Sequence, residues 1–113
     1  MSRFELTETE AGDGCREIHV EGELDLAVCD RLQEAIGSKD DRILIDLEEC
    51  RFIDSSAIAV ILRAYSCDGS RIVVHSPGGQ VLRVLEITGL TGNGLVFGNR
   101  EQALRALAGA ADS

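Results

Sequence analysis

The chain has 113 residues, 44% of them hydrophobic, with a formal net charge of −9 and a pI near 4.6. This length and apolar content predict one domain, residues 1–113, with a single core and no room for a second domain. The acidic balance argues against nucleic acid as a partner, because phosphate backbones are bound through clustered Lys and Arg. It suits a protein partner with a basic face.

The N-terminus and the apolar runs of the sequence predict neither export nor membrane insertion. The N-terminus lacks the apolar stretch and cleavage site of a secretory signal, so we expect a cytoplasmic protein. The longest apolar run covers residues 57–62, whereas a membrane span needs about 20 apolar residues. No membrane span is predicted.

Four cysteines are scattered along the chain: Cys15, Cys29, Cys50 and Cys67. They form no C-x-x-C pair and have no histidine at ligand spacing, so no metal site is predicted. Four free thiols are the expected state in a reducing cytosol, with a regulatory disulfide as the alternative.

The first elements predicted are an edge strand at about residues 3–7 and a strand at residues 16–22. In the second, charged and apolar side chains alternate, which is typical of a half-buried strand. Asp25 is then placed to cap a helix that ends at Gly37. Its apolar stripe has helical spacing and consists of Leu26, Cys29, Leu32 and Ile36.

A compact apolar run at residues 43–47 predicts a central strand that is covered on both faces. Asp54 is placed to cap a second helix, and Gly69 marks the exit from it. Residues 71–75 predict the next strand. The apolar face of the second helix consists of Ile58, Ile61, Leu62 and Tyr65.

Ser76 and Pro77 open a third predicted helix, which ends at Gly89. Residues 95–97 add a short strand. The inward side chains of the third helix are expected to be Val81, Leu82, Leu85 and Ile87.

Asn99 is placed to cap a last helix, and the residues after Ala108 read as a frayed tail, so the ordered core is expected at about residues 3–108. The inward residues of that helix are Ala103, Leu104 and Leu107. Strand and helix thus alternate. This order predicts an α/β fold with a mixed, largely parallel sheet of about four to five strands packed by about four helices.

The most informative segment is residues 45–62, where a buried strand leads through a short turn into a helix that starts with Asp54-Ser55-Ser56. Capping alone explains most such starts, because Asp and Ser satisfy the first N–H groups of a helix.

Three motifs follow one another along the chain: Gly22-Glu23-Leu24-Asp25, then Phe52-Ile53-Asp54-Ser55-Ser56-Ala57-Ile58-Ala59-Val60, then Leu85-Glu86-Ile87-Thr88-Gly89-Leu90. Together they resemble the STAS family, specifically the bacterial anti-sigma factor antagonists. The resemblance implies the STAS fold for the whole chain.

The same resemblance implies a switch at Ser55, the first serine of the Asp-Ser-Ser element. In the family this serine is phosphorylated by a kinase that is also an anti-sigma factor. The unmodified form binds the kinase and frees the sigma factor, and a metal-dependent serine phosphatase resets the switch. ATP would be used by the partner kinase, so no cofactor of the chain itself is expected.

The physics at Ser55 is compatible with this role. A helix N-terminus can hold a phosphate without unfolding the domain. The added charge of about −1.5 to −2, beside Asp54, would disturb any partner packed closely on Ser55.

Two residues of this segment, Ala57 and Ala59, stand where the family usually has glycine, which puts in doubt how closely a partner can approach. On a helical wheel, Ser56, Ala59, Val60 and Arg63 lie opposite the apolar stripe. Asp25 is a cap, a border of the partner surface, or both. The predicted partner-binding residues are Asp25, Asp54, Ser55, Ser56, Ala59, Val60 and Arg63.

No catalytic cluster is evident, so we expect no enzyme. Residues 92–94 read as a loop rather than a dinucleotide fingerprint, and Ser55 is outside a Gly-x-Ser-x-Gly elbow. His19 and His75 read as ordinary strand residues. The alternative function is a constitutive STAS scaffold subunit of a larger assembly, such as a lipid transporter or a stress-sensing complex, in which the serine remains as a cap.

Overall fold

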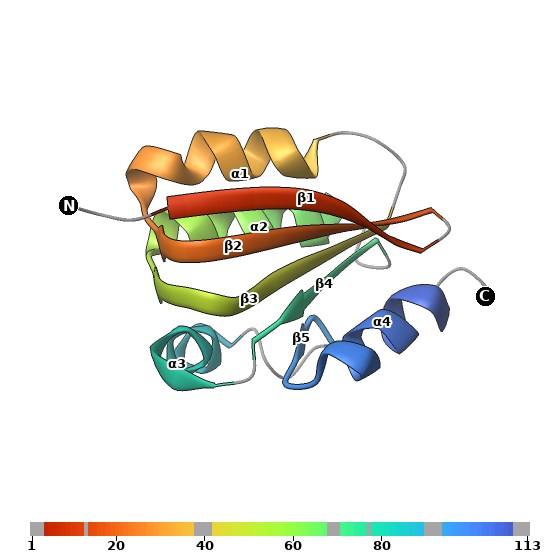
Figure 1. Cartoon of the computed structure of the whole chain (residues 1–113). Coiled ribbons are helices and arrows are strands. Elements are labelled where there is room, and N and C mark those ends of the chain that lie inside the picture. Colours follow the sequence, from red (N-terminus) through yellow and green to blue (C-terminus); the bar gives the residue numbers. More distant parts are fainter. Residues whose placement is uncertain are drawn as a thin grey trace.

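The computed structural model describes residues 4–12, 14–37, 42–67, 71–76, 78–89 and 94–109. Within them, strands and helices alternate after an initial hairpin (Figure 1). The elements are β1 (Phe4–Gly12), β2 (Cys15–Leu24), the short 3-10 helix η1 (Leu26–Val28), α1 (Cys29–Ile36), β3 (Arg42–Ile53), α2 (Ser55–Cys67), β4 (Ile72–His75), α3 (Gly79–Ile87), β5 (Val96–Phe97) and α4 (Arg100–Gly109).

The strands form a five-stranded sheet in the order β1-β2-β3-β4-β5. β1 pairs with β2 antiparallel, and the other three pairings are parallel. Gly14 lies in the connection of the β1–β2 hairpin with φ 71°, a conformation that favours glycine. The mixed, largely parallel sheet predicted from the order of the elements is confirmed.

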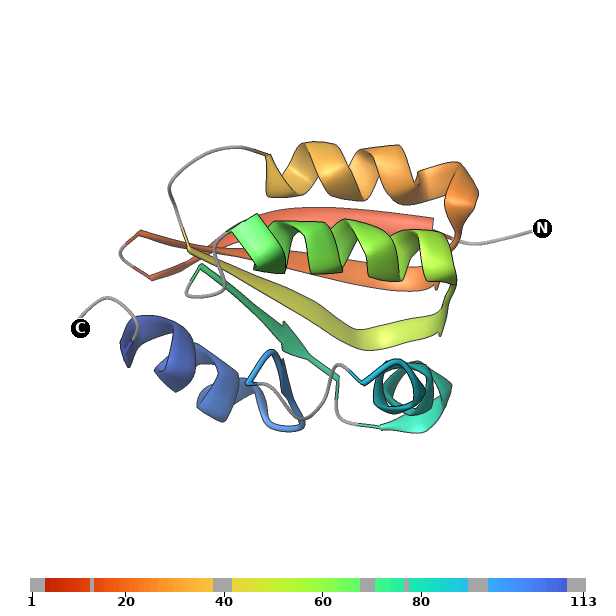
Figure 2. The same cartoon turned by 180° about the vertical axis from the view of Figure 1, so that it is seen from behind.

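The main core lies on one face of the sheet, where α1 and α2 run side by side (Figure 2). Side chains of α3 join the same core, and α4 packs on the opposite face against β3 and β4. The fully buried residues with the largest side chains are Ile18, Leu24, Leu32, Ile43, Leu44, Ile45, Leu47, Ile61, Ile72, Leu85, Leu95 and Leu107.

The period of two along the strands divides the side chains between the two faces. On β3, Ile43 and Ile45 belong to the main core, whereas Leu44 packs with α4. Asp46 has the parity of Leu44 and is 3% exposed. The face of the sheet that α4 covers is therefore apolar at Leu44 and carries a buried carboxylate two residues further along β3, at Asp46. We call it the α4 face.

Two strands are longer than predicted. β1 extends to Gly12 rather than ending near residue 7, because it pairs with nearly the whole of β2. β3 continues to Ile53 instead of ending at residue 47, since its pairing with β2 runs past two irregularities to the pair Leu24 and Ile53. The short turn predicted before α2 is thus mostly strand.

Two apolar residues predicted to face inward are exposed. The first helix is split into η1 and α1, and this leaves Leu26 71% exposed. Ile87, at the end of α3, is 77% exposed. Both predictions were wrong because a residue in the first or last turn of a helix can lie beyond the surface that the helix covers.

The third helix begins at Gly79, later than predicted. Asn99 caps α4 as predicted, since its side-chain Oδ1 accepts a hydrogen bond from Gln102 N at 3.1 Å. Some predictions concern residues that the structure does not describe. These are Arg3, Gly69, Pro77, residues 92–93 and the tail after residue 109. In the part of the chain that the structure describes, no helix is long and apolar enough to cross a membrane.

Candidate functional site

The candidate site lies at the edge of the sheet where β2 and β3 end. Leu24 and Ile53 are register partners at the ends of these parallel strands, so the residues that follow, Asp25 and Asp54, leave the sheet at the same edge. The Asp54 N–H donates to Leu24 O at 3.2 Å, which fixes the two connections to each other. The starts of α1 and α2 consequently lie at the same end of the molecule (Figure 2).

Asp54 uses both of its carboxylate oxygens. Oδ1 accepts hydrogen bonds from Ser56 N at 3.0 Å and Ala57 N at 3.1 Å, which satisfies two N–H groups in the first turn of α2. Oδ2 accepts from Leu26 N at 2.9 Å. Asp54 is therefore both the cap of α2 and a bridge to η1, a second role that the local sequence could not show.

Asp25 is a cap as well. Its Oδ1 accepts from Ala27 N at 3.1 Å at the start of η1. The cap interpretation of Asp25 is confirmed, and the bond from Leu26 N to Asp54 ties the residue that follows Asp25 to the cap of α2. Between the two aspartates, Leu26 presents an exposed apolar side chain.

Ser55 is the first residue of α2, and its side chain is exposed, whereas Ser56 is half-buried. The two alanines at family glycine positions differ: Ala57 is fully buried and Ala59 is exposed. Only Ala59 therefore affects how closely another molecule can approach α2.

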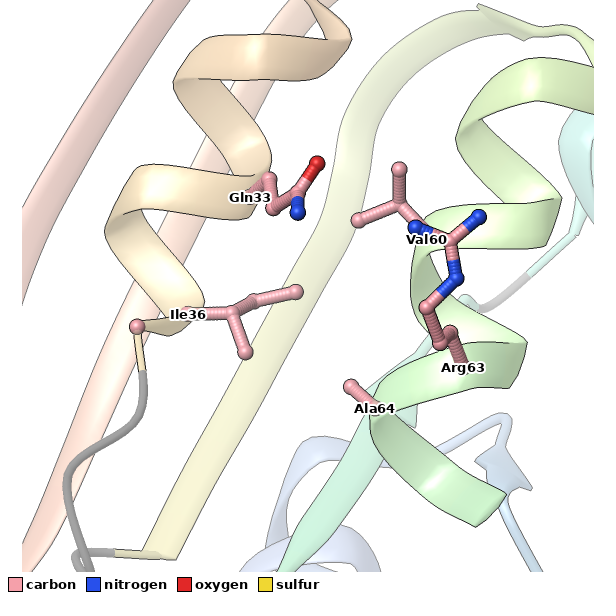
Figure 3. A pocket seen from close by; sticks show the side chains of 6 residues that line it. Gln33, Ile36, Val60, Arg63 and Ala64 are labelled. Carbon is pink, nitrogen blue, oxygen red and sulfur yellow. The ribbon is translucent and has the colours of Figure 1, made fainter. Parts of the chain in front are cut away.

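A shallow groove of about 160 Å³ runs between α1 and α2 (Figure 3). Gln33 and Ile36 of α1 point toward α2, and Val60 points back toward α1. The full lining is Gln33, Ile36, Gly37, Val60, Arg63 and Ala64.

The edge around Ser55 is acidic. Burial raises the pKa of the Cys29 thiol, and the neighbouring carboxylates of Asp54, Asp25 and Asp30 raise it further. A negative group added at Ser55 therefore joins carboxylates that are already close together. A partner for the unmodified edge would be complementary to it if its face were basic.

A family model described as "Mlab, STAS domain" matches residues 7–97, which includes this edge and both helices of the groove. The chain belongs to the STAS domain family. No curated protein sequence matches it.

Solved structures share the STAS fold of this chain at low sequence identity. An anti-sigma factor antagonist from Mycobacterium paratuberculosis is 23% identical, with a TM-score of 0.83 over 94% of this chain and 95% of that chain. The anti-sigma factor antagonist SpoIIAA is similar in its unphosphorylated form, at 21% identity and a TM-score of 0.73 over 93% and 97%. SpoIIAA from Bacillus in its phosphorylated form is 20% identical, with a TM-score of 0.65 over 89% and 97%.

A sulfate transporter family protein from Wolinella succinogenes also has this fold, at 15% identity and a TM-score of 0.70 over 93% of each chain. At these identities the likeness establishes the STAS fold, and it leaves the activity of this member to be argued from its own residues.

The predicted partner residues of the STAS domain fall into two adjoining groups. Asp25, Asp54, Ser55 and Ser56 lie at the sheet edge, whereas Ala59, Val60 and Arg63 lie along α2. Val60 was predicted to be an exposed contact, but it is half-buried because it packs against the main core and lines the groove. Ala59 and Arg63 are exposed, as predicted.

Two features of the STAS domain were missed. The first is Leu26, which was assigned to the inner stripe; its place directly after a capping aspartate was the signal that it begins the helix. The second is on the α4 face, where His19 and His75, predicted to be ordinary strand residues, both contact the buried Asp46. Chain spacing could not reveal this contact because the three residues come from three strands.

Proposed function

We propose that this STAS domain is an anti-sigma factor antagonist that acts by binding rather than catalysis. Unmodified, it binds an anti-sigma factor kinase; phosphorylation of Ser55 releases the kinase, and a serine phosphatase restores the binding form. The observation that carries the proposal is the position of Ser55. It is exposed at the start of α2 and directly follows Asp54, whose two carboxylate oxygens both accept backbone hydrogen bonds.

The hydrogen bonds of Asp54 explain why a phosphate at Ser55 would change the surface. Two N–H groups of the first turn of α2 are already bonded to Asp54 Oδ1, so the phosphate would compete with a carboxylate for the same donors. Its charge of about −1.5 to −2 would instead extend into solvent beside Asp54. A kinase packed on this edge would have to desolvate that charge, and affinity would fall.

The fold is expected to outlast the modification. The helix dipole of α2 favours a negative group at its N-terminus, and the first residue of a helix contributes little to the core. The STAS protein SpoIIAA, solved in unphosphorylated and phosphorylated forms, has the fold of this chain in both. This supports a switch that works through the surface rather than through unfolding.

The surface proposed for the kinase combines three neighbouring parts. Ser55 and Leu26 supply a polar switch beside an exposed apolar side chain. The groove between α1 and α2 lies beside Ala59 on the same helix, and its lining offers the apolar side chains of Ile36 and Val60 with the cation of Arg63 beside them. Binding hot spots in protein interfaces commonly have this arrangement, an apolar anchor beside polar groups whose hydrogen bonds are made.

Leu26 provides a test of this surface by titration calorimetry against an anti-sigma factor kinase from the same organism. We expect Leu26→Ala to weaken binding by at least about tenfold, since hot-spot truncations cost more than about 1–2 kcal/mol. Ile87→Ala is the matched control, because Ile87 is as exposed but lies on α3. Equal affinities for the two variants would contradict the placement of the surface.

A constitutive scaffold is the second candidate function. The likeness to a sulfate transporter family protein favours it, since a STAS domain there belongs to a different class of protein. A scaffold needs Asp54 as a cap but no chemistry at Ser55. Its partner would bind the wild type and Ser55→Glu equally, whereas the antagonist would lose affinity in Ser55→Glu.

A further inference from the structure

A cluster of metal-ligating side chains lies on the α4 face of the sheet, away from Ser55. His19, Asp46 and His75 are register partners across β2, β3 and β4, so the parallel pairing places the three side chains side by side. They are the two histidines of the chain and a carboxylate that is 3% exposed. Nothing in the proposed switch uses them.

The two oxygens of Asp46 have different environments. Oδ1 lies 2.9 Å from His75 Nδ1 and accepts from Glu48 N at 3.0 Å, both ordinary hydrogen-bond lengths. Oδ2 lies 3.4 Å from His19 Nδ1, beyond the usual range for such a bond. Asp46 is thus firmly held on one side and loosely paired on the other.

The loose side matches the spacing of ligands around a tetrahedral metal ion. Bonds of about 2.0–2.1 Å to nitrogen and oxygen place neighbouring ligand atoms about 3.3–3.4 Å apart. A third donor is at hand, because ligand atoms of Glu17, His19 and Asp46 all lie within 4.8 Å of one another. The His19 side chain is 29% exposed, which gives an ion a path from solvent.

The charges around the cluster favour a cation. Glu17 is buried and pairs with Arg100, while Glu49 Oε1 lies 4.0 Å from His19 Nε2. With Asp46 and Glu48, four carboxylates among the described residues thus lie in or beside the cluster. The Arg100 guanidinium pairs with the Glu17 carboxylate and so restricts its position.

We propose that Glu17, His19 and Asp46 bind a divalent first-row transition ion such as Zn²⁺, with water at the fourth position. Imidazole and carboxylate donors suit these ions. His75 is a positioning residue: its bond to Oδ1 orients Asp46 so that Oδ2 faces the ion, as partners of metal-ligating carboxylates do. The ion would link β2 to β3 and stabilise the sheet on its less apolar face.

The cysteines are the competing ligands. Burial raises the pKa of the Cys50 thiol, as it does for Cys29, which makes the metal-binding thiolate of either residue harder to form. Cys15 is less buried and lies on the α4 face. Co²⁺ distinguishes the donor sets, because thiolate ligation adds a strong near-ultraviolet charge-transfer band that nitrogen and oxygen donors lack.

The test is calorimetric titration of the metal-stripped protein with Zn²⁺, repeated with Co²⁺ by absorption. We expect one equivalent to bind, no thiolate band, and a higher Tm with metal. His19→Gln should lower the Zn²⁺ affinity by more than about 10–100-fold, the loss typical of a residue that only supports a ligand. Glu10→Gln, at an exposed residue of β1, should leave the Zn²⁺ affinity unchanged. If His19→Gln fails to fold, Glu17→Gln serves as the ligand variant.

His75 is tested separately through rescue. His75→Ala should weaken Zn²⁺ binding about 10–100-fold, and His75→Asn, which keeps a donor for Oδ1, should recover part of the loss. Absence of saturable one-equivalent binding, affinity unchanged in His19→Gln, or a thiolate band would each overturn the proposal and leave the cluster as a hydrogen-bonded network.

Discussion

At the scale of single residues, Asp46 shows how its neighbours decide the state of a buried acid. Burial alone would raise the pKa of Asp46, but the hydrogen bonds from Glu48 N and His75, the charge of His75 and the longer contact with His19 lower it below the ordinary value. A buried carboxylate that keeps its charge is thus stabilised by its neighbours.

This lowered pKa predicts a pH dependence of stability. Above the unfolded-state value of about 3.9, ionised Asp46 stabilises the fold; as the pH falls through the folded-state pKa, that contribution is lost. Asp46→Asn should therefore cost about 1–3 kcal/mol at neutral pH and progressively less toward pH 3. Urea unfolding of both proteins with a chelator checks this.

Glu10→Gln is the control for the acid titration, because Glu10 is exposed and lies outside the cluster. Its stability difference from the wild type should stay near zero at every pH. A penalty for Asp46→Asn that is the same at pH 3 and pH 7 would mean that Asp46 contributes nothing through its charge.

Contacts within one turn could be predicted from the sequence, whereas contacts between distant segments could not. Asn99 and Asp54 were predicted as caps because capping depends on residues within one turn. The bond from Leu26 N to Asp54 Oδ2 was not predictable, since it joins segments 28 positions apart. The same holds for His19 and Asp46, which are neighbours only through strand register.

At the scale of elements, Asp54 couples three of them: it follows β3, caps α2 and holds η1. Removing its carboxylate therefore loosens two helix starts at once. Asp25, by comparison, accepts one side-chain hydrogen bond among the described residues, from Ala27 N of η1. The difference in stability lost when each carboxylate is removed therefore reports on the bond between Asp54 and Leu26 N.

We predict that Asp54→Ala lowers the free energy of unfolding by about 2 kcal/mol, at the upper end for an N-cap. Asp25→Ala should cost about 0.5 kcal/mol, at the lower end for one hydrogen bond. Asp54→Asn should fall between them because it keeps one acceptor oxygen. Chemical denaturation of the three variants gives the order, and equal losses for Asp54→Ala and Asp25→Ala would rule out the bridge.

Element types were predictable where the pattern was local, and lengths were not. The helical spacing of apolar residues was enough to predict α2 and α4, and the alternation of charged and apolar residues was enough to predict β2. The extension of β3 past Leu47 was missed because residues 48–52 are mostly polar, and only pairing with β2 keeps them extended. Similarly, α1 was predicted one turn too long because the 3-10 turn at Leu26 depends on Asp54.

At the scale of the whole molecule, the order of elements was enough to predict a largely parallel sheet, and the three motifs were enough to indicate the STAS family, which the family model shows. The sheet brings two functional regions to separate places. The proposed switch lies where β2 and β3 end, and the histidine cluster lies on the face toward α4.

We propose that Ser55 is the phosphoacceptor and that its modification changes binding without unfolding the domain. Ser55 is exposed and Ser56 half-buried, and the two lie about 100° apart around the axis of α2, so a kinase cannot reach them equally. The phosphorylated protein should keep a cooperative melting transition near that of the unmodified form, because α2 tolerates charge at its N-terminus.

The most direct measurement is fragment mass spectrometry after incubation with ATP and an anti-sigma factor kinase from the same organism. The wild type and Ser56→Ala should each gain one phosphate, located on Ser55 by the fragments, and Ser55→Ala should gain none, with a melting curve of the modified sample showing a folded domain. Phosphate on Ser56, a modified protein that has unfolded, or a wild type that no such kinase modifies would contradict the switch, and the last result would favour the constitutive scaffold.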